Sequence, residues 1–371
     1  MSEGNYPTRS TSFFKLIPIA GTVGIPIASI LLAGLIGAIL LRMSEVNPVD
    51  AYWALFEGAF GDFDAITRTL EKSAPLVYSG LAVAFALKAG LFNIGAQGQL
   101  LFGALAAAIM GFVIKGLPVV IHVPLSLFAG ALAGGIYGGI KGALKAYTGA
   151  HEVITGIMLN YVAINFTEYM AAGPFQDTSP GNILARTSRI LETAIIPHVG
   201  HIPLGFVLAM VIAMIVWLFF RHTVIGFEIK TVGQNIRAAC YAGIKVSRTV
   251  ILTMMLSGLL AGLGGAIETL GIVYRFQPGF NVGIGFDGIA IALLARTHPL
   301  GIIPASVLFG AMKAGAGLMQ FDAGVTPEII DVIQALILFF IAADLLIRRL
   351  IRLPKEDREN IPLTTGWGKL I

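Results

Sequence analysis

Apolar runs separated by short polar connectors dominate the pattern of this chain. Most of the runs are long enough for an α-helix to cross the hydrocarbon core of a bilayer. The chain therefore predicts an all-α integral membrane protein with one transmembrane domain over residues 1–371. We expect about ten transmembrane helices, at residues 16–41, 73–88, 99–114, 119–141, 153–172, 204–220, 249–272, 286–295, 300–319 and 327–347.

Four polar segments flank these runs and orient them. Arginine and lysine gather in segments 1–15, 221–248 and 348–371, which the positive-inside rule assigns to the cytoplasm. Ten crossings place both termini on that side, whereas an odd number would move one of these segments outside. Segment 43–72 mixes acids with aromatic side chains, so we expect an amphipathic segment that lies on the external membrane surface.

Composition supports a membrane protein. Apolar residues make up 56% of the chain and charged residues only 12%, about half the share in soluble domains. Cys240 is the single cysteine, which excludes an internal disulfide and a cysteine-built metal site. The first apolar run is too long for a signal peptide, so we expect it to be a retained helix. Glycines 130, 134, 138 and 142 recur every four residues and predict close packing against a neighbouring helix.

Two stretches of the chain resemble each other. Each begins with Ser-Gly-Leu, at Ser79 and at Ser257, and continues through a Gly/Phe/Asn-rich break into a small-residue helix. The two Ser-Gly-Leu helices run in opposite directions, which indicates an inverted repeat of spans two to five and seven to ten. In transporters with such repeats, the broken helices line the substrate path. Shared glycine-rich composition is the alternative explanation of the likeness.

The breaks supply the candidate path residues. Polar groups inside a membrane protein are costly unless partnered, so they mark either function or interhelical hydrogen bonds. The candidates are Asn93, Gln97, Gln99, Phe280, Asn281 and Asp287. Amides beside phenylalanines suit a neutral, hydroxylated or heteroaromatic solute. Tyr161, Asn165 and Glu168 share one face of the fifth span, and Glu268, Lys313 and Gln334 lie inside other spans.

The sequence does not support dinucleotide binding, ATP hydrolysis or metal binding. Gly283, Gly285 and Gly288 match GxGxxG, but they lead into an apolar helix rather than following a strand, so we expect them to free the backbone beside the path. No GxxxxGK[ST] motif is present, so the chain does not hydrolyse ATP through a P-loop. His198 and His201 have no cysteine or acid at ligand spacing. We therefore expect no metal site, no cofactor and no enzymatic activity.

Three segments resemble one known family. They are NPVDAYWALFEGAFG (47–61), GLFNIGAQGQLLFGALAAA (90–108) and VGQNIRAACYAGIKVSRTVILTMMLSGLLAGLGGAIE (232–268). They are similar to the nucleoside and simple-sugar permeases of the ABC importer superfamily, with ribose and branched-chain amino acid permeases as more distant relatives. Gln97 stands where many relatives have an acid, which leaves the solute open.

The resemblance implies a multi-pass permease subunit in the cell membrane that binds no ATP itself. A second permease, identical or a sister, would complete the pathway, and an extracytoplasmic binding protein would deliver the solute. The ATPase subunit would bind segment 221–248 through Gly233, Asn235, Ala238, Ala239 and Gly243. An ion-gradient-driven secondary transporter is the alternative, because intramembrane Glu268 and Lys313 would suit it. A channel or a purely structural membrane subunit is the third.

Overall fold

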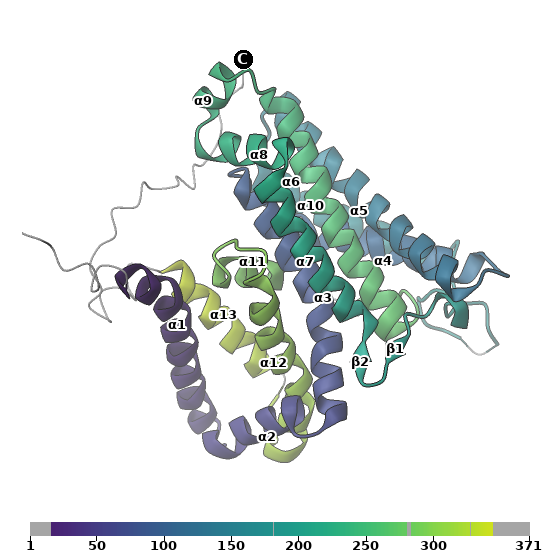
Figure 1. The fold of residues 1–371 in the computed structure, drawn as a ribbon. Helices are drawn as coiled ribbons and strands as arrows, with labels where there is room; N and C mark the ends of the chain where they lie inside the picture. Colours follow the sequence, from purple (N-terminus) through teal and green to yellow (C-terminus); the bar gives the residue numbers. More distant parts are fainter. Residues whose placement is uncertain (1–15, 181, 280–282, 327, 344–371) are drawn as a thin grey trace, which may run out of the picture.

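A computed structural model describes residues 16–180, 182–279, 283–326 and 328–343 (Figure 1). This part of the chain is almost wholly helical. The α-helices are α1 (Leu16–Met43), α2 (Pro48–Phe60), α3 (Phe63–Lys88), α4 (Ala96–Val113), α5 (Val119–Thr148), α6 (Glu152–Ala172), α7 (Leu204–His222), α8 (Val224–Gln234), α9 (Ile236–Tyr241), α10 (Val246–Glu268), α11 (Ile284–Leu294), α12 (Ile302–Ala323) and α13 (Glu328–Ala342). A 3₁₀ turn η2 (Glu192–Ala194), a π-helical turn η3 (Thr269–Val273) and the antiparallel pair β1 (His198–Val199) and β2 (Ile202–Pro203) complete the order.

The helices agree with the expected spans in part. The described part of each of the ten predicted spans falls on a helix, residues 327 and 344–347 of the last span lying outside the described residues, and this part of the chain is all-helical apart from the short β1–β2 pair. Within the described residues, six helical stretches are both long and apolar enough to cross a membrane. They are Pro26–Met43, Ala96–Val113, Val119–Thr148, Leu204–His222, Val246–Val273 and Ile302–Ala323. Helix α11 is apolar but shorter.

Two predicted segments are divided differently in the structure. Segment 43–72 holds α2, which ends before Gly61, and the first turns of α3, which begins at Phe63 and continues through the second predicted span. The Asp62 carboxylate accepts the Ala65 N–H at 2.5 Å and caps α3. The small-residue stretch 232–246 reads in the sequence as one short helix, and that prediction is wrong. Asn235 is extended there, so that it ends α8 and caps α9.

A seam of glycines joins α5 to α10. A Cβ atom added at Gly134 would lie 2.5 Å from the Gly258 carbonyl oxygen, and one at Gly142 would lie 2.9 Å from Ile251 Cα. Gly262 faces the backbone of Gly130 and Gly134 in the same way. The backbones therefore touch without intervening side chains, which confirms the packing predicted from the four-residue glycine spacing.

The outer faces of several helices are apolar. On α1 the exposed side chains recur every four residues, at Ile27, Leu31, Leu35 and Ile39. On α5 they follow the same spacing, at Phe128, Leu132, Ile136 and Ile140. In water such stripes would be covered by another element, whereas lipid tails cover them in a membrane protein.

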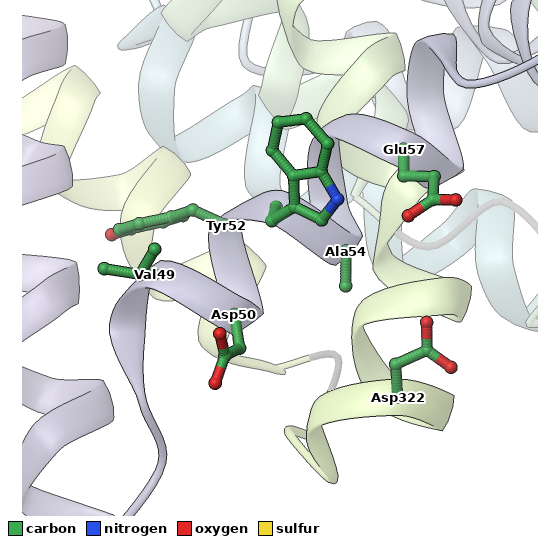
Figure 2. A pocket seen from close by; sticks show the side chains of 7 residues that line it. Val49, Asp50, Tyr52, Ala54, Glu57 and Asp322 are labelled. Carbon is green, nitrogen blue, oxygen red and sulfur yellow. The ribbon is translucent and has the colours of Figure 1, made fainter.

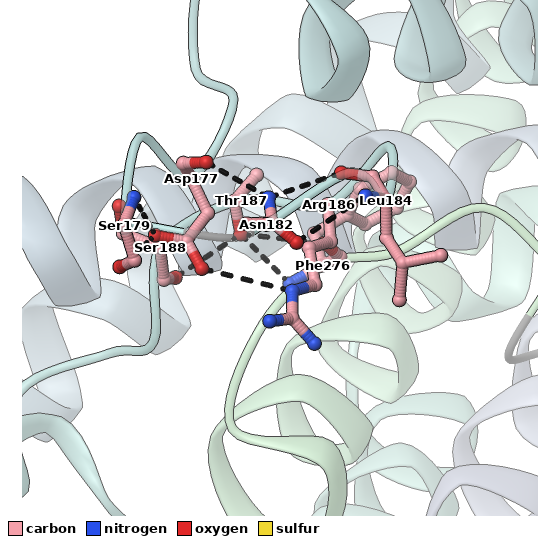
Figure 3. Close-up of polar contacts among 8 residues, drawn as sticks. All are labelled: Asp177, Ser179, Asn182, Leu184, Arg186, Thr187, Ser188 and Phe276. Atoms are coloured by element: carbon pink, nitrogen blue, oxygen red, sulfur yellow. Dashed lines mark hydrogen bonds and ion pairs between the residues drawn. The ribbon is translucent and has the colours of Figure 1, made fainter.

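The loop between α6 and α7 is fastened to the segment that follows η3 (Figure 3). Thr187 N–H donates to the Phe276 carbonyl at 2.9 Å, and Phe276 N–H donates to Thr187 Oγ1 at 3.0 Å. Ser179 donates to Asp177 through its hydroxyl and its backbone N–H. These hydrogen bonds, with the nearby guanidinium group of Arg186, hold the pKa of Asp177 below its usual value. These hydrogen bonds thus fix residues 177–187 of the loop against the segment after η3.

We expect Gly262→Ala to destabilise the protein, because the new methyl group would overlap the Gly130 carbonyl across the seam. Overpacking of this kind costs about 1–3 kcal/mol. Thermal denaturation in detergent measures the effect as a lower midpoint. Gly317→Ala on α12 is the matched control, since a Cβ atom there meets nothing within 4 Å. Equal midpoints for the two variants would contradict the packing role of the seam.

Candidate functional site

The break between α3 and α4, residues 89–95, is organised around the side chain of Asn93. Its amide nitrogen donates to Gln99 Oε1 at 2.8 Å and to Ser257 Oγ at 2.7 Å, and its oxygen accepts from Lys141 Nζ at 3.1 Å. Ser257 Oγ in turn donates to the Ala82 carbonyl at 2.6 Å. One amide therefore ties together α3, α4, α5 and α10.

Two lysines near the end of α5 are buried, with 1% and 2% of their surface exposed. The Lys141 ammonium also donates to the Phe92 carbonyl at 3.2 Å, and so satisfies backbone that the break leaves outside a helix. Lys145 Nζ lies 2.7 Å from Glu152 Oε2 at the start of α6. This ion pair fixes the turn between α5 and α6.

Helix α11 begins against α3 and α4. Gly283, with φ 90°, starts it in a backbone conformation that glycine adopts readily. The Gly285 N–H donates to Gln97 Oε1 at 2.8 Å, and Ser79 Oγ donates to the Ile284 carbonyl at 2.9 Å. Added Cβ atoms at Gly285 and Gly288 would overlap the backbones of Gln97 and Ser79. Of these three glycines, Gly283 thus provides the turn before α11, and Gly285 and Gly288 allow close contacts with α4 and α3.

A polar pair lies on the other side of α11. Lys313 Nζ of α12 is 3.0 Å from Asp287 Oδ2, and both side chains are partly exposed, at 25% and 18%. Phe286 beside them is 44% exposed. A carboxylate, an ammonium group and an aromatic ring next to one another can bind hydroxyl groups and stack on a planar ring.

The residues predicted to line the solute path therefore differ in how exposed they are. Asn93, Gln97 and Gln99 are at most 4% exposed and hydrogen-bonded between helices. In this conformation they pack the core, and their contact with a solute stays a prediction. Asp287 is the partly open member, whereas Phe280 and Asn281 lie outside the described residues.

Helix α6 has three polar side chains that the rest of the described chain does not cover, among exposed apolar ones such as Met158 and Ile164. Tyr161 is 62% exposed, and Asn165 and Glu168 are exposed on the same face. The Asn165 amide donates only along its own helix, to the Tyr161 carbonyl at 2.7 Å. A charged side chain within a spanning helix normally faces a water-filled cavity or another protein helix. The sequence indicated this shared face without assigning it a role.

Segment 221–248 folds as α8 and α9 at one end of the molecule (Figure 1). Of the five residues predicted to contact an ATPase, Asn235, Ala238 and Gly243 are exposed. Ala239 is fully buried, and Gly233 packs on the backbone of Lys88 and Ala89. Gly233 and Ala239 therefore hold the segment on the helical body and do not belong to its outer surface.

The outer surface of α9 includes residues that the sequence reasoning did not select. Tyr241 is 94% exposed, and Arg237 and Cys240 are also exposed. Helix α9 and the turn at Gly243, φ 79°, present these side chains together. In the sequence, Asn235 could have indicated where α9 begins, because Asn is a common helix cap. The starting residue of this short helix determines which of its side chains face outward.

A hollow of about 640 Å³ lies at the opposite end, between α2 and the end of α12 (Figure 2). Asp50 and Glu57 of α2 and Asp322 of α12 surround it. The Tyr52 hydroxyl beside it donates to the Gly34 carbonyl at 2.7 Å, which joins α2 to α1. Among the residues that the structure describes, no group of three or more His, Cys, Asp or Glu side chains could hold a metal ion.

Comparison with known proteins gives a family and several relatives. The family described as branched-chain amino acid transport system / permease component matches residues 65–342. The guanosine ABC transporter permease NupP of Bacillus subtilis is 38% identical over 328 residues, covering 87% of this chain and 94% of the relative. The nucleoside ABC transporter permease NupB of Lactococcus lactis is 36% identical, with 89% and 93% covered. The glucose ABC transporter permease TsgB13 of Haloferax volcanii is 33% identical, with 88% and 89% covered.

We expect Asn93→Leu to lower stability strongly, because it leaves the buried Lys141 ammonium without one of its acceptors and removes the bonds to Gln99 and Ser257. The loss should be about 3 kcal/mol or more. Asn165→Leu on α6 is the control, since it removes only a bond within its own helix. Denaturation in detergent should separate the two variants. Similar midpoints would mean that the Asn93 network does not stabilise the fold.

Proposed function

The chain belongs to the permease family of the branched-chain amino acid transport systems, and on that premise we propose that it carries nucleosides or related simple sugars across the cell membrane. As an ABC permease component it is a transport subunit and not itself an ATPase. In the proposal an ATPase subunit drives import by alternating access. The guanosine, nucleoside and glucose permeases among its relatives support this solute class.

One observation carries the proposal, namely the basic segment 221–248, whose helices α8 and α9 are partly exposed and rest on the end of α3. A permease without a nucleotide site needs a surface through which another subunit's ATP hydrolysis can act on it. We assign that surface to Asn235, Ala238 and Gly243, together with Arg237 and Tyr241. Their exposure, and the backbone contact of Gly233 beneath them, support the assignment.

The proposed topology has ten crossings, with α8–α9 and both termini in the cytoplasm. The α5–α6 turn belongs to the same end as α8–α9, because Gly142 packs against Ile251 in the first turns of α10. Helix α2 and the β1–β2 pair lie at the other end (Figure 1). Segments 1–15 and 348–371 lie outside the described residues, so their side rests on the positive-inside rule.

Reciprocal contacts support an inverted repeat of α3–α6 and α10–α13. Ser79, in the Ser-Gly-Leu of α3, donates to the start of α11. Ser257, in the Ser-Gly-Leu of α10, accepts from Asn93 just before α4. Helices α4 and α11 are the second helices of the two proposed halves, so each Ser-Gly-Leu helix contacts the opposite half near the start of its second helix, with Ser79 donating and Ser257 accepting. That exchange is what a pseudo-two-fold axis produces.

We place the solute path beside α6 and α11, between this chain and a second permease, either a copy or a sister. Lipid would leave Glu168 and Asn165 in hydrocarbon, whereas a partner helix and an aqueous path would solvate them. Phe286 and Asp287 add a stacking ring and a hydroxyl acceptor, which suit a nucleoside or a sugar. The outer end, with α2 and the α6–α7 loop, would receive the binding protein.

The secondary-transporter alternative is tested by reconstitution. We expect the permeases, ATPase and binding protein together to accumulate labelled guanosine in liposomes only with ATP. Unlabelled nucleosides, ribose and glucose as competitors identify the solute class. This chain alone should not accumulate the label under a proton or sodium gradient. Accumulation by the chain alone would overturn the ATP-driven proposal.

For the docking surface, we expect Ala238→Arg to abolish co-purification of the ATPase, because a long charged side chain would stand on the contact face. The permease should still insert, since Ala238 is exposed. Ser44→Arg, also exposed but between α1 and α2 at the end opposite α8–α9, is the matched control and should keep the complex. A complex that survives Ala238→Arg unchanged would remove α9 from the docking surface.

A further inference from the structure

Residues 88–97 run from the end of α3 to the first turn of α4. They contact α8 at one end and α11 at the other. At the first end, Gly233 of α8 packs on the backbone. A Cβ atom added there would overlap the Lys88 carbonyl and lie 3.0 Å from Ala89 Cα. Gly90, with φ 70°, returns the contact, since a Cβ atom on it would be 3.5 Å from Gly233 Cα. No side chain separates the two segments here.

At the other end, the Gln97 side chain supplies a hydrogen-bond acceptor that α11 does not have at its own amino end. Gly283, the residue before α11, has no side chain to cap it. The Gln97 side chain reaches across from the first turn of α4 and accepts the Gly285 N–H at 2.8 Å. The first N–H groups of a helix have no acceptor within the helix, so α11 needs acceptors from other elements or from solvent. Gln97 thus positions the amino end of α11.

The residues between these two contacts are held as one unit. Asn160 of α6 donates to the Ile94 carbonyl at 3.0 Å and accepts the Gly98 N–H at 2.9 Å. Lys141 donates to the Phe92 carbonyl and to Asn93. A displacement of residues 89–90 therefore reaches Gln97 with little room for the intervening residues to absorb it.

We propose that residues 89–97 transmit the movement of α8–α9 to α11, and that Gln97 is the positioning residue of this link. The inference rests on the proposed function, in which an ATPase moves α8–α9. Helix α11 carries Phe286 and Asp287, so a shift of its amino end changes the groups offered to the solute. It would also strain the Asp287–Lys313 ion pair, which ties α11 to α12.

The test uses the complete transporter in liposomes, with uptake, ATP hydrolysis and ATPase content measured on the same samples. Gln97→Met keeps the size of the side chain and removes the acceptor. We expect uptake to fall about tenfold or more while ATPase content and hydrolysis stay within about twofold of the unchanged protein. Gln97→Glu should restore uptake, because a carboxylate accepts the same N–H and is favoured at a helix amino end.

Gln334→Met on α13 is the control for loss of a buried amide. Gln334 is 4% exposed, and its amide nitrogen has no hydrogen-bond partner among the described residues. Its uptake should match that of the unchanged protein. The link is overturned if Gln97→Met transports normally, or if uptake, hydrolysis and ATPase content fall together in both Gln97 variants. Failure of the proposed function is seen separately, as absence of ATP-dependent uptake by the unchanged protein.

Discussion

The structure depends on satisfying polar groups that are buried between helices, such as Asn93, Gln97 and Lys141. A chain that leaves its helix between α3 and α4 exposes carbonyl groups that lipid cannot bind. Lys141 and Asn160 reach across to the Phe92 and Ile94 carbonyls, and Asn93 fills the space between four helices. Without those side chains the break could not exist. With them, α11 has a fixed place to begin, and α8 has a fixed surface on which to rest.

Much of the fold could be predicted from the sequence because lipid imposes simple rules. Apolar length gave the helices, and glycine spacing gave the α5–α10 seam. The divisions at Gly61 and Asn235 could not be predicted with the same ease, since each depends on one side chain capping a helix. Both positions carry a typical cap or break residue, so the signal was present but too local to outweigh the surrounding pattern.

The candidate site shows a different limit. Sequence spacing indicates which residues share a helix face, as it did for Tyr161 and Asn165, but it does not tell which face another helix covers. The amides of Asn93, Gln97 and Gln99 looked like solute ligands because polar groups in a membrane protein are rare. The geometry gives each of them a partner on another element. Likewise, Gly233 and Ala239 lie in segment 221–248 but face the helical body on which it packs.

The glycine seam has a mechanical consequence. Side chains between two helices can change rotamer and so let one helix slide while the other stays. Between α5 and α10 there are no such side chains where Gly134 meets Gly258 and Gly262. The two helices therefore form a stiff double rod, about as long as the bilayer is thick. A force applied near Val246 or at the α5–α6 turn would tilt the whole rod and reach the opposite end as a rotation rather than as a local rearrangement.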